Sequence, residues 1–163
     1  AGFQSYVLNS RRPRLADPRV REALGLALDY EWMNRQMFYN GYPRVQDLFG
    51  NTDCAATGQP SPDELALLAP WRGKVPDKVF GPMYQPPVTE GPGQSLRNNL
   101  RRAQALLKEA GWEYRDGALR NAKGEPMVLE YLDSRDTGVR TLSPWIRNLE
   151  KLGVVLGHGG TYG

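Results

Sequence analysis

The sequence predicts an α/β fold, in which short strands alternate with amphipathic helices. Three observations lead to this class. Several segments repeat apolar residues at helical spacing behind a capping residue. Other short segments are rich in apolar and β-branched residues and lie between turn residues. Along the chain, the strand-like segments stand before, between and after the helical ones, as is typical of α/β proteins.

The first segment, residues 3–9, partly alternates apolar and polar side chains, with Phe3, Tyr6 and Leu8 as apolar positions. This period of two predicts a strand. The following stretch, residues 10–17, is rich in arginine and proline and is predicted to be a loop.

A helix is predicted to begin directly after Asp17. The Asp17 side chain suits the N-cap, and Pro18 then occupies the first helical position, where its missing N–H costs nothing. Arg19 and Arg21 fall outside the apolar stripe, so we expect them to reach solvent or a carboxylate. The stripe itself repeats every three or four residues and comprises Val20, Ala23, Leu24, Ala27 and Leu28.

A second helix is predicted from the cap Asp29 to Gly41, followed by an irregular loop. Ser61 and Glu64 then form a capping box around Pro62, which predicts a helix over 61–70. Residues 71–94 are rich in proline and glycine. A loop of that length is usually functional or wraps the surface.

The clearest helix covers residues 95–110 and stops at Gly111. A turn at Asp116–Gly117 then predicts a short hairpin that leads into a strand at 127–133. A helix over about 138–152 follows. The segment after Gly153 starts as a strand, and its glycine-rich end predicts that the strand stops almost at once.

Composition excludes several classes of function. The net charge is +3 over 163 residues, which is too mild to indicate nucleic acid by itself. Cys54 is the only cysteine, so no internal disulfide forms, and with one histidine no zinc site of nitrogen and sulfur ligands can be assembled. No apolar run reaches the roughly 18 residues that cross a bilayer, and no cofactor motif is present.

A hydrolase is one alternative, since His158-Gly159-Gly160 is like the oxyanion loop of some esterases. The matching G-x-S-x-G nucleophile motif is absent, and the spacing of Cys54 and His158 gives no support for a nucleophile and base. A nucleic-acid or anionic-surface binding module is a second alternative, built on the arginine-rich helix segment 97–108. A solvated helix face explains those arginines more simply, because no aromatic residues are interleaved.

The best candidate site is the run Asp133-Ser134-Arg135-Asp136. It follows a predicted strand and precedes a predicted helix, where open α/β sheets bind ligands. Arg135 can clamp a carboxylate through two parallel hydrogen bonds. Paired carboxylates for acid–base chemistry, or a plain polar turn in which Asp136 caps the helix, remain open as alternatives.

Residues 6–42 resemble a segment of the family 5 extracellular solute-binding proteins, the peptide and nickel group that serves ABC importers. The resemblance rests on an Asn, a Pro, an Asp-x-Arg-Val-Arg turn, an apolar run and a later Gly, found here as Asn9, Pro13, Asp17, Arg19, Val20, Arg21, Ala23, Asp29, Glu31 and Gly41. The later blocks ALLKEAGW and NLEKLGV are also similar to the family, and the loop 50–103 is similar to the oligopeptide-binding subgroup associated with microcin C uptake.

The resemblance implies a periplasmic-binding-protein fold of type II, with residues 1–163 as one partial lobe, the second, of a two-lobe protein. It implies a periplasmic, non-enzymatic component that captures oligopeptides between its lobes and delivers them to a membrane permease. Asp133, Ser134 and Arg135 would line the cleft, with Tyr84 or Tyr42 adding an aromatic contact. It also implies that Arg19 and Arg21 anchor their helix rather than bind ligand.

Overall fold

The structure is a computed structural model, and it describes residues 4–133 and 138–161. These residues form two compact units. The smaller unit contains residues 44–86 together with residues 4–5, and the larger unit contains residues 6–43 and everything described from residue 87 onward. Each unit is described by itself below.

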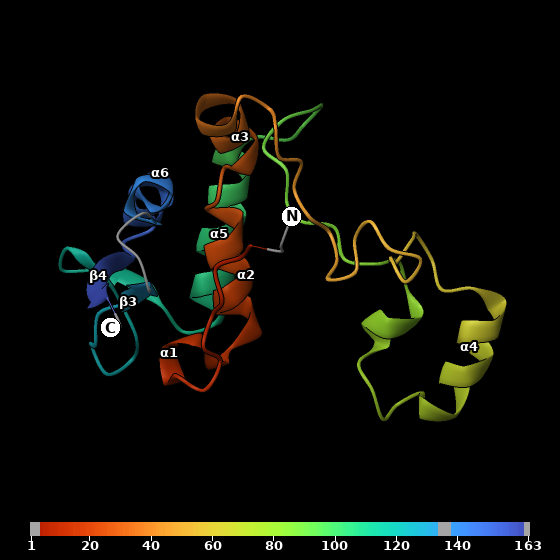
Figure 1. Cartoon of the computed structure of the whole chain (residues 1–163). Helices are drawn as coiled ribbons and strands as arrows, with labels where there is room; N and C mark the ends of the chain where they lie inside the picture. Colours follow the sequence, from red (N-terminus) through yellow and green to blue (C-terminus); the bar gives the residue numbers. More distant parts are fainter. Residues whose placement is uncertain (1–3, 134–137, 162–163) are drawn as a thin grey trace. The chain divides into compact units, whose positions relative to one another are not determined.

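The larger unit contains two long helices that pack side by side, α2 (Pro18–Leu26) and α5 (Leu96–Glu109), as Figure 1 shows. Each begins as its sequence predicts. The Asp17 carboxylate accepts a hydrogen bond from the backbone N–H of Arg19 at 2.8 Å, and the Ser95 hydroxyl accepts one from Asn98. Both caps satisfy N–H groups that lack a partner in the first turn.

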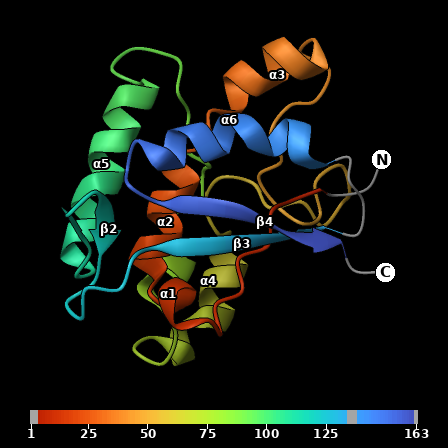
Figure 2. The same ribbon diagram turned by 90° about the vertical axis from the view of Figure 1, so that its left-hand side faces the viewer.

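A β-α-β unit packs beside these helices. It consists of β3 (Val128–Asp133), α6 (Val139–Glu150) and β4 (Val155–Thr161). The two strands are parallel, with Val128 opposite Val155 and Tyr131 opposite His158. Parallel strands need a crossover, and α6 supplies it along one face of the strand pair (Figure 2). This topology confirms the strand and helix predicted for this part of the chain.

The core lies between α2, α5, α6 and the strand pair. Two α6 side chains donate hydrogen bonds to backbone carbonyls in and just after the last turn of α2. The carbonyls at a helix C-terminus have no N–H partner within the helix. Trp145 Nε1 donates to the carbonyl of Leu24 at 2.9 Å, and Asn148 Nδ2 donates to that of Ala27 at 3.0 Å, both buried. Around them lie fully buried side chains from every layer: Val20, Leu24, Leu107, Met127, Leu142, Leu149 and Val154.

The predicted loop before Asp17 contains a short helix, α1 (Pro13–Ala16), so the loop prediction was wrong there. Pro13 begins it for the same reason that Pro18 begins α2. Arg21 Nη1 donates to the carbonyls of Leu15 and Ala16 at 2.8 and 2.7 Å. Its guanidinium therefore satisfies two carbonyl groups at the end of α1, as expected for a structural arginine.

Arg19 is structural as well. Its guanidinium donates to the Asp17 carboxylate, with a shortest distance of 2.7 Å, and to the carbonyl of Glu109 at the end of α5 at 3.1 Å. The hydrogen bond from the Arg19 side chain, followed by that from the Arg19 backbone, holds the pKa of Asp17 below its ordinary value. The pair fixes the start of α2 and joins it to α5.

The strand predicted over residues 3–9 is wrong for the residues that the structure describes. Residues 4–9 have no regular secondary structure and pair with no strand. The apolar residues of the pattern serve packing instead, because Tyr6 and Leu8 are partly buried against the core of the larger unit. Alternation alone cannot distinguish these two outcomes.

The helix α3 (Tyr30–Phe38) is capped by Asp29 as predicted, but it ends earlier than Gly41. Tyr39 and Asn40 adopt the left-handed conformation and turn the chain. Thr89, only 9% exposed, links the segment that precedes α5 to the start of α3. Its hydroxyl lies 2.5 Å from Asp29 Oδ1 and 2.9 Å from Glu31 Oε2.

The predicted hairpin is present as β1 (Glu113–Arg115) and β2 (Ala118–Arg120), which pair antiparallel. Asp116 and Gly117 both have positive φ values, of 49° and 78°. That combination is the two-residue turn that matches the twist of a hairpin.

The prediction that the last strand stops early was wrong, because β4 runs through the glycine-rich segment to Thr161. Gly159 explains how this sequence becomes a strand. A Cβ at this position would collide with the side chain of Glu130, which extends from the neighbouring strand. Glycine at this position therefore leaves room for the Glu130 side chain to lie against β4 while the two strands pair.

The smaller unit contains α4 (Pro62–Leu68), η1 (Ala69–Trp71) and η2 (Asp77–Phe80), joined by loops. The capping box is confirmed, since Ser61 and Glu64 each accept from the other's backbone N–H. No described residue between 44 and 86 is buried, and contacts at its surface include the Arg72 guanidinium 4.1 Å from the centre of the Phe80 ring. The long loop therefore has local order without a core of its own.

Candidate functional site

The candidate site lies where β3 ends and α6 begins, within the larger unit. Asp133 is the last residue of β3, and Gly138 and Val139 open α6. The carboxyl end of a strand in such a sheet is where ligands bind. The described side chains that gather here are those of Tyr6, Tyr131, Asp133 and Thr141.

Tyr131 and Asp133 point to the same side of β3, since they are two residues apart on one strand. The Tyr131 hydroxyl donates to Asp133 Oδ2 at 3.3 Å. Burial of the phenol raises the pKa of Tyr131, and the nearby Asp133 carboxylate adds to that rise. The phenol is therefore a neutral donor over the whole physiological range, and Asp133 is an acceptor half exposed to solvent.

Tyr6 reaches the site from far away in the sequence. Its ring stacks on Trp145, with centroids 5.0 Å apart, and meets Tyr131 edge to face at 5.9 Å. Its hydroxyl donates to Thr141 Oγ1 at 3.3 Å, and the Thr141 hydroxyl donates to the carbonyl of Gly138 at 2.9 Å. The aromatic rings thus support a row of hydroxyl groups beside the start of α6.

Gly138 completes this arrangement because no side chain fits at its position. A Cβ there would lie 2.8 Å from the Tyr131 hydroxyl and would collide with the Asp133 carboxylate. Real Cβ contacts are not that short, so a larger residue would displace both polar groups. Gly138 therefore allows the backbone to approach the polar end of β3.

The structure describes some of the predicted site residues and not others. Asp133 is in place at the end of β3, while Ser134, Arg135 and Asp136 lie outside the described residues. Tyr84 belongs to the smaller unit and is 69% exposed, so its role stays a prediction. Tyr42, in the larger unit, meets Phe38 edge to face at 5.5 Å.

Sequence reasoning missed Tyr6, Tyr131, Gly138 and Thr141. The alternation around Tyr6 was the available signal, but it indicated a strand rather than a contact with α6. Tyr131 had a clearer signal, because it is two residues before Asp133 on the predicted strand and so shares its face.

The described site can form hydrogen bonds and present aromatic surface. Asp133 can accept from an amide or an ammonium group, and the ring edges offer apolar contact. Among residues 4–133 and 138–161, no group of three His, Cys, Asp or Glu side chains is arranged to hold a metal ion. In the same part of the chain, no helix combines the length and hydrophobicity that crossing a bilayer requires.

The arginine-rich face of α5 is only partly free. Arg102 forms an ion pair with Glu22 of α2 at 2.6 Å, which joins the two packed helices. A charge used in this way gives less support to the nucleic-acid alternative, because it already has a partner.

Comparison with known protein families shows which family the chain belongs to. The sequence profile of the bacterial extracellular solute-binding proteins, family 5, matches residues 1–156. The chain belongs to this family. The predicted family resemblance is therefore confirmed.

Curated relatives include a protein of Escherichia coli K12 called "Uncharacterized protein YejA", 42% identical over 149 residues, and a protein of Agrobacterium fabrum called "Probable peptide-binding protein YejA", 36% identical over 153 residues. These alignments cover 91% and 93% of this chain. They cover 24% and 25% of the relatives, so the chain spans about a quarter of the length of the proteins it matches.

Solved structures of the family share the fold. NikA from Brucella suis matches with a TM-score of 0.60 at 21% identity, over 94% of this chain and 25% of NikA. AppA from Bacillus subtilis matches with a TM-score of 0.56 at 19% identity, over 91% of this chain and 24% of AppA. The predicted class, an α/β fold of the type II periplasmic binding proteins, is confirmed.

Proposed function

We propose that the protein containing this chain is the binding component of an ABC importer that captures oligopeptides. The observation that carries the proposal is family 5 membership, together with the 36% identity to a relative that is named as a peptide-binding protein. A further relative, 33% identical over 157 residues, is named "Peptidoglycan-binding protein YepA". Both names are consistent with a ligand that contains peptide, since peptidoglycan contains short peptides.

In this proposal, residues 1–163 form part of the second lobe, and the end of β3 faces the bound peptide. Asp133 accepts from a peptide N–H or amino group, and Arg135 clamps a peptide carboxylate, with Ser134 beside it. The hydroxyl groups of Tyr6 and Tyr131 hold the supporting wall in place. Tyr84 offers an aromatic contact to the peptide in this proposal.

The proposed protein works in the periplasm, has no enzymatic activity and passes its peptide to a membrane permease after the two lobes close by a hinge. We also propose membership of the subgroup associated with microcin C uptake.

The test is calorimetric titration of the protein at its full natural length with a pool of short peptides, followed by single peptides from that pool. Arg135→Ala removes the proposed clamp. Arg147→Ala is the matched control, because Arg147 is an exposed arginine later on α6, two to three turns from Gly138.

Removing a hydrogen bond to a charged group costs about 1.5–3 kcal/mol, which is roughly a 10- to 150-fold loss of affinity. We expect that loss for Arg135→Ala and unchanged binding for Arg147→Ala. Native binding with no effect of Arg135→Ala would overturn the site assignment and keep the function. Absence of binding by the native protein would overturn the function itself.

A further inference from the structure

A second surface of the larger unit forms a groove away from the candidate site. It lies between the first half of α5 and the end of α6, with a volume of about 380 Å³. Leu96 and Leu100 are half-buried on one side, and Leu152 is buried at the base. The exposed side chains of Arg97, Arg101 and Lys151 stand around this apolar surface, with Gln104.

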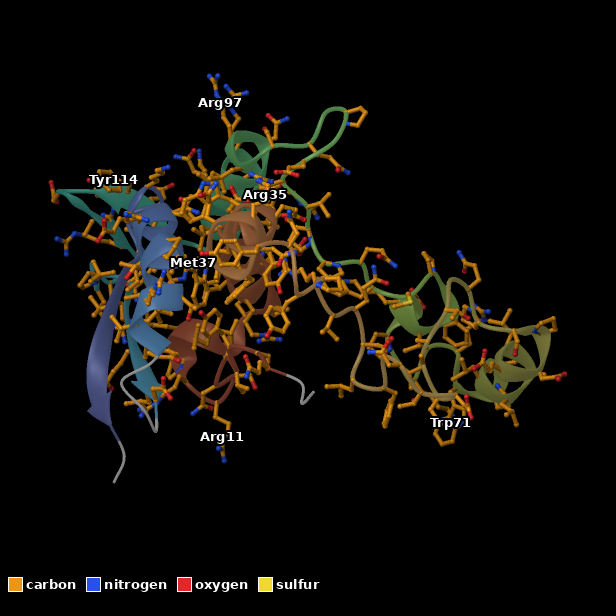
Figure 3. All side chains as sticks on the ribbon, turned by 45° about the horizontal axis from the view of Figure 1, so that its top comes forward. Arg11, Arg35, Met37, Trp71, Arg97 and Tyr114 are labelled. Atoms are coloured by element: carbon orange, nitrogen blue, oxygen red, sulfur yellow. The ribbon has the colours of Figure 1, made fainter. Side chains whose placement is uncertain are left out.

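The groove is positively charged and its charge is not balanced locally. Its lining contains no acidic residue, and no carboxylate within the described ranges forms an ion pair with Arg97, Arg101 or Lys151. The neighbouring Arg102 is different, since it is paired with Glu22. Arg97 projects away from the ribbon of α5 into open space (Figure 3).

Arg97 and Arg101 are also four residues apart on one helix, where like charges repel each other. A helix gains nothing in its own stability from this arrangement. It does obtain two guanidinium groups on the same face, each able to bind a carboxylate through two hydrogen bonds.

We propose that this groove docks an acidic, amphipathic segment of a partner protein. Apolar side chains of that segment would cover Leu96, Leu100 and Leu152, and its carboxylates would pair with Arg97, Arg101 and Lys151. The charge of the groove specifies the acidic partner, and the leucines specify a segment that carries apolar side chains beside its acids.

Other anionic occupants fit the surface less well. Single-stranded nucleic acid needs aromatic side chains on which bases stack, and the groove lining has none. A membrane surface favours a longer run of basic residues, of about four to eight. The three cations and apolar base of this groove match a short protein segment better.

The groove and the peptide site are distinct. The groove includes Lys151 and Leu152, which follow α6, whereas the site surrounds Gly138, which precedes it. A helix of 12 residues separates them, which corresponds to about 18 Å. Partner docking therefore does not depend on the proposed peptide capture.

The experiment measures fluorescence anisotropy of a dye-labelled probe peptide titrated with the full-length protein. The probe is an amphipathic peptide of about 15 residues, near the shortest length at which an isolated helix forms in water, with a leucine stripe flanked by glutamates. A second probe carries glutamine in place of every glutamate. The double variant Arg97→Gln/Arg101→Gln removes two of the three positive charges of the groove, and Lys108→Gln is the matched control, because Lys108 is exposed on the same helix outside the groove lining.

We expect the acidic probe to bind and the double variant to bind it about two- to thirtyfold more weakly, as for two partly screened charge pairs. Lys108→Gln should bind like the native protein, and the glutamine probe should bind more weakly. Arg135→Ala should leave probe binding unchanged, which separates this groove from the peptide site.

Three results would overturn the proposal. The native protein fails to bind the acidic probe, or the double variant binds it as tightly as Lys108→Gln does. In the third, a 12-nucleotide single strand or vesicles containing phosphatidylglycerol bind through Arg97 and Arg101 more tightly than the probe, which would assign the groove to a different class of partner.

Discussion

Asn148 offers the sharpest test of how α6 holds α2. Its side chain is 8% exposed, and its amide donates to the carbonyl of Ala27 at 3.0 Å. Asn148→Ala leaves that carbonyl buried without its partner, which costs about 1–3 kcal/mol. Taking about 2 kcal/mol, the exchange of protected amides in α2 should become roughly 30-fold faster.

Hydrogen–deuterium exchange of the full-length protein, followed by mass spectrometry of peptides from residues 18–28, measures this change. Asn98→Ala is the matched control, since Asn98 also donates to a carbonyl, that of Gly93 at 3.1 Å, but in an exposed position. Water can replace that bond, so the free energy of unfolding should change by less than about 0.5 kcal/mol. Equal exchange rates in α2 for both variants would refute the role given to Asn148.

Three further predictions concern the charge of Asp17, the ionisation of Tyr131 and the space beside Gly138. Because the pKa of Asp17 is lowered in the folded protein, its charge contributes stability at neutral pH that is lost as the pH falls below 3.8. Asp17→Asn, which retains a capping side chain, should be less stable at pH 7 and match the native protein in acid; urea unfolding at both pH values measures this, and an equal deficit in acid would contradict it. The pKa of Tyr131 is raised, so the native protein should lose stability as the pH rises above 10.0, and Tyr131→Phe should lose less; parallel alkaline unfolding curves would oppose this reading. Gly138→Ala should cost about 1–3 kcal/mol by overpacking against Tyr131 and Asp133, and unchanged thermal unfolding would show that this space is not needed.

The sequence was most informative where structure depends on neighbouring residues. Asp17 and Ser61 both cap helices as predicted, because a cap needs only the backbone N–H groups that follow it. The turn at Asp116–Gly117 was also predictable, since its two positive φ values suit these residue types. The strand ending at Asp133 followed from its bounded apolar pattern.

The errors arose where contacts between residues far apart in the sequence determine the local structure. Residues 4–9 have the alternation of a strand, but Tyr6 packs on Trp145, which is 139 positions later, and no strand pairs with the segment. The end of β4 is glycine-rich, and it remains a strand because it pairs with β3, where Asp133 lies opposite Thr161. Within the site, Asp133 was predictable from its place after a strand, whereas Tyr6 and Thr141 depend on the tertiary fold.

The central claim is that the end of β3 faces the captured peptide. A crystal structure of the full-length protein with a bound peptide tests it most directly. We predict a peptide atom within hydrogen-bonding distance, about 2.7–3.2 Å, of a polar group of Asp133, Ser134 or Arg135. A bound peptide that leaves all three residues without a direct or water-mediated contact would contradict the claim.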